Sequence, residues 1–170
     1  MKNTHLVYFL LSFAMTAFAF AQTPSKDFSC EVEPVARKQF GELVGNAGCF
    51  VLDKQKLLVV QVIHNGRGLD IPGGTSEKGE SAQCTAARET LEETGLTVVV
   101  HELAHTFGKF YLFRCELKDP SQADLVGTPK DFQLEIAKAF WLDVFQSDEK
   151  QWRFPKQLRV LKGMVHYTQD

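Results

Sequence analysis

Three glutamates near the middle of the chain, Glu89, Glu92 and Glu93, have the spacing of neighbours on one helix face. Positions i, i+3 and i+4 lie on the same side of an α-helix, so the three carboxylates would point in one direction. Like charges at this spacing destabilise a helix by about 0.2–0.5 kcal/mol per pair. A bound cation would remove this penalty, and Mg²⁺ takes carboxylates and substrate phosphates as ligands. The alternative is an acidic solvated face, which is common on surface helices.

An arginine and a pair of glycines beside the glutamates would suit a metal site. Arg88 precedes Glu92 by four residues, so it is placed to pair with that carboxylate and hold it in position. Gly73 and Gly74 precede the acidic segment, and glycine lets the backbone approach a metal or a phosphate closely.

The spacing of these residues resembles the Nudix box, over residues 74–96. The matching positions are Gly74, Glu80, Arg88, Glu89, Glu92, Glu93, Gly95 and Leu96. One position differs slightly from the family pattern, because Thr90 stands where the family usually carries an aliphatic residue. Weaker resemblance extends upstream to residues 56–61 and downstream to Glu135, which lies six residues before Trp141.

The resemblance implies an α/β fold, a Nudix-type α/β/α sandwich with a mixed sheet between helices. It also implies metal-dependent hydrolysis of a phosphoanhydride bond in a nucleoside diphosphate linked to another moiety. Glu89, Glu92, Glu93 and the carbonyl of Gly74 look like ligands of Mg²⁺ or Mn²⁺. Arg88 looks like the residue that orients these carboxylates, and Glu80 like an outer acid near the start of the helix.

The general base has two candidates, because the family places it variably: Glu93 inside the box and Glu135 outside it. Glu135 could equally be an exposed carboxylate at the end of a strand. For the substrate, Trp152 could stack on a base and Arg153 could contact phosphate, or both could belong to a packed corner. Tyr111 alternates with Phe113 on a predicted strand, so it could face either the core or a substrate pocket.

A protein of another class would also fit the box: a Nudix-fold module that binds or senses a nucleotide without cleaving it. The complete set of glutamates favours the hydrolase, since a pure sensor has no need of every ligand. The formal net charge of the chain is -2, and no basic run is present, so we expect no nucleic-acid polymer as a partner. Nothing in the sequence indicates an oligomeric state.

The N-terminus has the layout of a secretory signal peptide: Lys2, an apolar run over residues 6–20, and Ala19 and Ala21 before a cleavage point. The run is short for a bilayer span of about 20 residues, so we expect export to the bacterial periplasm or medium, with no membrane span left after cleavage. In an oxidising compartment an even number of cysteines favours disulfides. We predict the pairs Cys84–Cys115 and Cys30–Cys49.

The chain therefore divides into a signal peptide (1–21), an N-terminal extension (22–46) and a Nudix domain (47–170). A short helix is predicted at 35–43, a hairpin at 48–52 and 56–62, and the metal-binding helix at 80–94, ended by Gly95. Further strands are predicted at 96–103, 106–117 and 132–142. A loop occupies 118–131, and a last helix 155–166.

Overall fold

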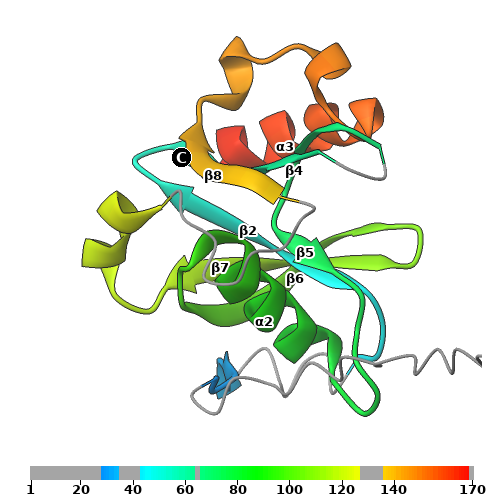
Figure 1. Ribbon diagram of the computed structural model, residues 1–170, viewed down its shortest axis with the longest axis vertical. Helices are drawn as coiled ribbons and strands as arrows, with labels where there is room; N and C mark the ends of the chain where they lie inside the picture. The colour runs from blue at the N-terminus through cyan, green and yellow to red at the C-terminus, as the bar shows by residue number, and fades with distance from the viewer. Residues whose placement is uncertain (1–27, 35–42, 64–65, 127–135, 169–170) are drawn as a thin grey trace, which may run out of the picture.

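A computed structural model describes residues 28–34, 43–63, 66–126 and 136–168 of the 170-residue chain (Figure 1). Its strands are β1 (Glu31–Val32), β2 (Ala47–Asp53), β3 (Lys56–Val62), β4 (Gly68–Asp70), β5 (Gly73–Gly74), β6 (Val98–Phe107), β7 (Phe110–Leu117) and β8 (Ile136–Leu142). Its helices are α2 (Ala82–Thr94) and α3 (Pro155–Tyr167). Short 3₁₀ helices cover Pro120–Leu125, Val144–Gln146 and Glu149–Gln151. No helix in these segments is long and apolar enough to cross a membrane.

The strands form a mixed sheet with the order β1-β6-β7-β2-β3-β4, to which β5 adds at β2 and β8 adds at β3. β1 runs parallel to β6 and β2 runs parallel to β7, whereas the other pairs are antiparallel. The predicted mixed sheet is therefore confirmed.

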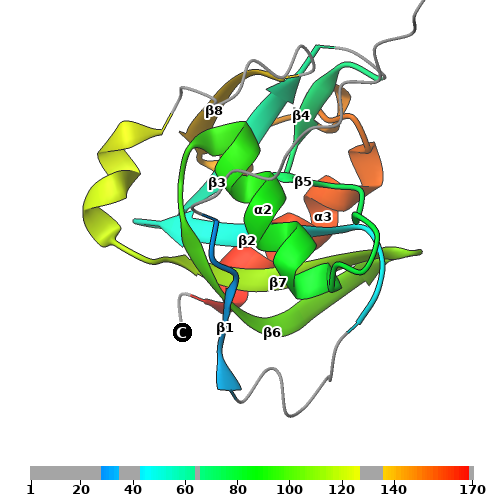
Figure 2. The same cartoon turned by 60° about the horizontal axis from the view of Figure 1, so that its bottom comes forward.

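Each face of the sheet is covered by a helix, because side chains on a strand alternate between faces. On β2, Cys49 and Val51 belong to the core cluster beneath α2, together with Ala82 and Ala86 of that helix. Phe50, between them, belongs to the opposite cluster with Leu158 and other side chains of α3. Figure 2 shows α2 in front of β2 and β7 and α3 behind them. The chain thus forms the predicted α/β/α sandwich.

α2 begins and ends at residues with strong capping preferences. The hydroxyl of Ser81 accepts a hydrogen bond from the Cys84 amide at 3.3 Å, as an N-cap does. Gly95 ends the helix in the left-handed conformation, with φ 76, and its amide donates to the Leu91 carbonyl. The predicted helix 80–94 is confirmed, with its start two residues later at Ala82.

The hairpin of β2 and β3 also agrees with prediction, but the next hairpin turns later than expected. β6 continues to Phe107 and β7 begins at Phe110, whereas the sequence predicted a break after residue 103. The turn falls at Gly108, whose φ is 62, because glycine adopts this conformation without steric cost. The predicted loop 118–131 contains the 3₁₀ helix Pro120–Leu125. The helix predicted at 35–43 lies almost entirely outside the described residues.

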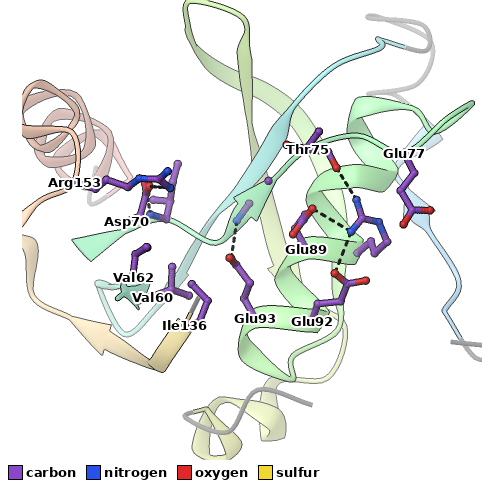
Figure 3. Close-up of a pocket in the computed structure, with 14 residues that line it drawn as sticks. Val60, Val62, Asp70, Thr75, Glu77, Glu89, Glu92, Glu93, Ile136 and Arg153 are labelled. Carbon is purple, nitrogen blue, oxygen red and sulfur yellow. Dashed lines mark hydrogen bonds and ion pairs between the residues drawn. The ribbon is translucent and has the colours of Figure 1, made fainter. Parts of the chain in front are cut away.

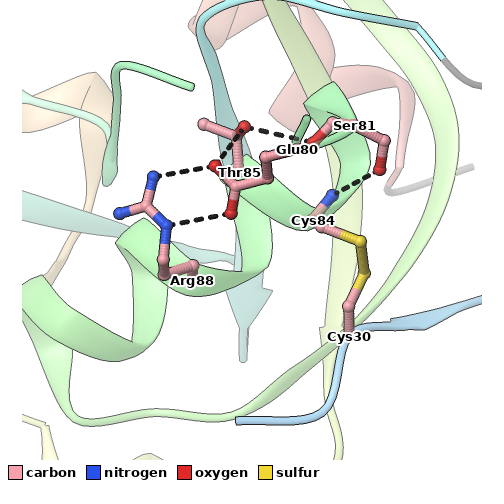
Figure 4. The surroundings of a disulfide bond; sticks show 6 residues. All are labelled: Cys30, Glu80, Ser81, Cys84, Thr85 and Arg88. Carbon is pink, nitrogen blue, oxygen red and sulfur yellow. Dashed lines mark hydrogen bonds and ion pairs between the residues drawn. A yellow bond between two sulfur atoms is a disulfide. The ribbon is translucent and has the colours of Figure 1, made fainter. Parts of the chain in front are cut away.

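The predicted disulfide pairing is wrong: Cys30 bonds Cys84 (Figure 4), and Cys49 bonds Cys115. All four cysteines are paired, as expected, but the partners differ. The parallel register of β2 and β7 places Val51 opposite Cys115 and Cys49 two residues away on the same face, so these two sulfurs meet in the core. Cys84 lies on the flank of α2, where it meets Cys30 just before β1 begins.

Candidate active site

A cleft of about 370 Å³ lies beside α2, lined by residues of α2, β3, β4, β5 and β8 and by Arg153 (Figure 3). This volume is within the range of about 300–1,000 Å³ usual for small-molecule sites. Glu89, Glu92 and Glu93 all line the cleft, so the structure brings the three predicted carboxylates to one place. The apolar part of the wall consists of Val60, Val62, Ile71 and Ile136.

Arg88 links three of the carboxylates. Its Nε donates to Glu80, its NH1 donates to Glu89 and Glu92 at 3.0 and 3.1 Å, and its NH2 donates to Glu80 and the Thr75 carbonyl. Burial opposes the charge of Arg88, but these carboxylates together raise the pKa of its guanidinium, which stays charged. Arg88 therefore holds Glu89 and Glu92 in position, as the sequence predicts.

Glu80 is the fixed anchor of Arg88 rather than part of the cleft. It also accepts hydrogen bonds from the Glu77 amide and, as Figure 4 shows, from the Thr85 hydroxyl, both at 2.9 Å. Burial raises the pKa of this carboxyl, but the hydrogen bonds from Arg88, Glu77 and Thr85 outweigh burial and lower the pKa below its ordinary value. The Glu80 carboxylate thus stays ionised and keeps Arg88 in place.

Glu93 is the most deeply buried acid of the cleft, with 7% of the residue exposed. One carboxylate oxygen accepts a hydrogen bond from the Gly73 amide at 2.9 Å. Burial raises the pKa of Glu93 well above its ordinary value, and the neighbouring charges of Glu89 and Asp70 raise it further. Burial thus makes Glu93 easier to protonate than an exposed glutamate, and a cation beside it would lower its pKa again.

Gly74 lies directly against Glu89. A Cβ at position 74 would be 2.5 Å from the carboxyl carbon of Glu89, so this position requires glycine while Glu89 is in place. Burial raises the pKa of Glu89, and Arg88 opposes that effect. The backbone of Gly74 and the carboxylate of Glu89 thus share one small region of the cleft.

Oxygen donors of this kind suit a hard divalent cation. In the described residues, however, no three acidic, histidine or cysteine side chains lie close enough to hold one ion as they stand. Arg88 engages Glu89 and Glu92, and the Gly73 amide engages Glu93. A cation would therefore have to draw these carboxylates from their present partners toward itself.

The candidate residues from the sequence did not include two acids that line the cleft, Glu77 and the buried Asp70. Only 8% of Asp70 is exposed, and burial raises its pKa to about 6, against weaker opposing effects of the Ile71 amide and Arg153. Its oxygens accept a hydrogen bond from Ile71 and lie 3.6 Å from NH1 of Arg153. The available signal was a single acid in the apolar segment directly before Pro72 and the paired glycines.

Of the three predicted substrate-binding residues, only Arg153 lines the cleft. Trp152 is 3% exposed, belongs to the core beside α3, and donates its indole N–H to Ser147. Its ring is therefore not available to stack on a base, which corrects that expectation. Tyr111 packs against the core cluster beneath α2 and is not among the residues that line the cleft.

Glu135 lies outside the described residues, so its part as a base stays a prediction. Its neighbour Ile136 begins β8 and lines the cleft. Thr90, the departure from the usual box, is fully buried and donates its hydroxyl to the Ala86 carbonyl at 2.7 Å. The helix therefore accommodates a polar residue at this apolar position.

Comparisons with known proteins agree with this geometry. The sequence profile of the NUDIX domain matches residues 43–160. A NUDIX hydrolase from Nitrosomonas europaea is similar in structure, with 21% identity, a TM-score of 0.54, and coverage of 70% of this chain and 87% of that chain. An ADP-ribose pyrophosphatase from Streptococcus suis has 16% identity, a TM-score of 0.53, and coverage of 74% and 91%.

A third similar structure is a binary complex of an Ap4A hydrolase from C. elegans, with 19% identity, a TM-score of 0.53, and coverage of 72% of this chain and 97% of that chain. No curated protein matches the sequence. At these identities the structural likeness shows the shared fold.

The profile match over more than half of the chain shows that this protein belongs to the Nudix family. It is accordingly a pyrophosphohydrolase of the class that acts on nucleoside diphosphate derivatives.

Proposed function

We propose that this protein is an exported, Mg²⁺- or Mn²⁺-dependent hydrolase of nucleoside diphosphates linked to another moiety. The supporting observation is the carboxylate set on α2: Arg88 contacts Glu89 and Glu92 at once, and Glu93 lines the same cleft. Members of the family generally use divalent metals. Glu89, Glu92, Glu93 and the Gly74 carbonyl would hold the ion here.

The residues of the site have different roles in the proposed reaction. A bound divalent cation would neutralise the diphosphate and lower the pKa of an attacking water. Arg88 orients the Glu89 and Glu92 carboxylates, and Glu93 or Glu135 accepts the proton of the water as its oxygen bonds to phosphorus. The bridging P–O bond then breaks, and the second phosphate leaves with the nucleotide or with the other moiety.

Export is proposed from the N-terminal signal layout together with the two disulfides. Disulfides persist in oxidising compartments, and the structure pairs all four cysteines of the sequence. We accordingly assign residues 1–21 to a signal peptide, 22–46 to an extension and 47–170 to the catalytic domain.

The test is a substrate panel with the oxidised mature protein and Mg²⁺, including ADP-ribose, a UDP-linked sugar and a dinucleoside polyphosphate. The similar structures carry different substrates in their names, so the shared fold does not choose among these compounds. Glu92→Gln removes one charged ligand and should lower kcat/KM for the preferred compound by about 100-fold or more.

The matched control is Glu102→Gln, since the Glu102 side chain is 50% exposed on β6 and pairs with Arg114 outside the cleft. This variant should keep wild-type activity. If wild type and Glu92→Gln were equally inert while a nucleotide still bound, the protein would be a binding module and the proposed hydrolase function would be lost.

A further inference from the structure

The cleft has two chemically different ends. Figure 3 shows Thr75, Glu89 and Glu92 at one end, Asp70 and Arg153 at the other, and Glu93 between them. The proposed function uses the acidic end, where a cation would hold phosphate. The end with Asp70 and Arg153 has no part in that chemistry.

Arg88 has no N–H donor left for a substrate in this structure. A guanidinium has five N–H donors, and Arg88 makes five hydrogen bonds, to Glu80, Glu89, Glu92 and the Thr75 carbonyl. Among the described residues that line the cleft, Arg153 is the other cation. A substrate phosphate that meets an arginine in the described cleft therefore meets Arg153.

The backbone fixes where the Arg153 side chain starts. The Arg153 amide donates to the Leu69 carbonyl at 2.9 Å, beside the bridge between Leu69 and Trp152. A Cβ on Gly68 would be 2.6 Å from the Arg153 nitrogen, so only glycine lets β4 approach this segment so closely. With the Trp152 ring buried, the segment is anchored on the side of the core.

Asp70 fixes the position of the Arg153 guanidinium group. One Asp70 oxygen accepts the Ile71 amide at 2.9 Å, and the other lies 3.6 Å from NH1 of Arg153. The side chain of Asp70 is 11% exposed and that of Arg153 is 32% exposed. The carboxylate is thus held by the fold, while the Arg153 side chain stays partly exposed, with its guanidinium over the exposed ring of Phe154.

We propose that Asp70 is a positioning residue that holds Arg153 in the cleft to bind a substrate phosphate at the end away from Glu89 and Glu92. This inference rests on the proposed function for the identity of the ligand class, a nucleoside diphosphate. A planar guanidinium anchored by one carboxylate still presents donors to a phosphate.

Whether Asp70→Asn weakens or strengthens anion binding separates a positioning role of Asp70 from a simple effect of its charge. Asp70→Asn removes a negative charge from an acidic cleft, so charge alone predicts tighter binding of an anion. Positioning predicts weaker binding, because Arg153 loses its partner. At pH 7.5 the comparison is clear, since the pKa of Asp70 is about 6 and its carboxyl is ionised.

The experiment measures binding of α,β-methylene-ADP with Mg²⁺ by titration calorimetry, since this probe cannot be cleaved at its methylene bridge. Arg153→Ala should weaken binding about tenfold or more, as loss of a charged hydrogen bond does. Asp70→Asn should weaken it severalfold, and the double variant should bind no worse than Arg153→Ala. Arg153→Lys, which keeps the charge, should fall between wild type and Arg153→Ala.

Arg114→Ala is the control, because Arg114 is a half-exposed, ion-paired arginine on β7 outside the cleft. Thermal unfolding of each variant verifies that it is folded. Unchanged or tighter binding by Asp70→Asn would overturn the inference, as would full binding by Arg153→Ala or no binding of the probe by wild type.

These outcomes are distinguishable from failure of the proposed function. If the substrate panel shows no hydrolysis but the binding pattern holds, the inference stands and the hydrolase proposal falls. If hydrolysis occurs, Arg153→Ala and Asp70→Asn should raise KM more than they lower kcat, because they act on substrate binding at a distance from the acidic end.

Discussion

At the scale of single residues, Arg88 has the most consequences for the site. It contacts carboxylates from three positions of one segment, and 10% of its side chain is exposed. Its planar guanidinium group donates hydrogen bonds to several carboxylates with a fixed geometry, which a single ammonium group does not do. The acidic face of α2 is therefore stabilised by this arginine in the absence of a cation.

Arg88→Lys should test this role, because lysine keeps the charge but cannot contact Glu80, Glu89 and Glu92 together. We expect kcat/KM and the apparent affinity for Mg²⁺ to fall about 10- to 100-fold, as for other residues that orient metal ligands. Steady-state hydrolysis over a Mg²⁺ series measures both. Arg114→Lys is the control, and wild-type kinetics in Arg88→Lys would contradict the orienting role.

Asp70 makes stability depend on pH. Its pKa rises from 3.8 to about 6, so between pH 4 and 6 the folded protein holds a proton that the unfolded chain has released. The contribution of this group to the free energy of unfolding therefore falls as pH rises through that window, by on the order of 2–3 kcal/mol. The nearby charges are Arg153, which opposes the shift, and Glu93.

Asp70→Asn cannot ionise, so its stability relative to wild type should increase between pH 4.5 and pH 7.5. Urea unfolding at both pH values, in EDTA to remove metal, measures the difference. A stability difference that does not change with pH would show that Asp70 does not hold a raised pKa.

At the scale of elements, the two disulfides have different surroundings. Cys49–Cys115 joins neighbouring strands inside the core, whereas Cys30–Cys84 ties the segment before β1 to the first turn of α2 (Figure 4). Cys84 lies one helical turn before Arg88, so this bond fastens the end of the helix that carries the Glu80–Arg88 ion pair.

Each disulfide closes a long loop, with separations of 54 and 66 residues. Removing either one as a double alanine variant should lower the free energy of unfolding by about 2–4 kcal/mol. The Cys49→Ala/Cys115→Ala variant should lose more, because it also removes buried side-chain atoms. Urea unfolding of both variants checks this order, and wild-type stability in either one would contradict it.

At the scale of the whole molecule, the sandwich places α2 on one face of the sheet and α3 on the other. The cleft forms where α2, β3, β4 and the Arg153 segment meet. Substrate would therefore contact parts of the chain that are far apart in sequence, joined by one sheet.

Export makes a prediction about the whole chain. The mature protein should begin at Gln22 and contain the bonds Cys30–Cys84 and Cys49–Cys115. N-terminal sequencing and a non-reducing peptide map of the exported fraction measure both features. Ala21→Arg should block cleavage, because the position before the cut needs a small residue. A mature fraction that retained residues 1–21 would contradict the signal peptide.

Much of the site was predictable because its pattern is local. The spacing of Glu89, Glu92 and Glu93 follows from the helical repeat, and the end of the helix at Gly95 follows from the conformation that glycine favours. The hairpin of β2 and β3 likewise has both strands and its turn within one short segment. These features depend on neighbours in the sequence, so the sequence by itself determined them.

Only the tertiary structure decided which distant residues meet. The cysteine partners depend on the parallel register of β2 with β7, and the Asp70–Arg153 pair depends on the bridge between Leu69 and Trp152. The same packing places Trp152 in the core and leaves Arg153 in the cleft. Such pairings are selected by burial and close approach across the whole molecule, and no short-range repeat in the sequence encodes them.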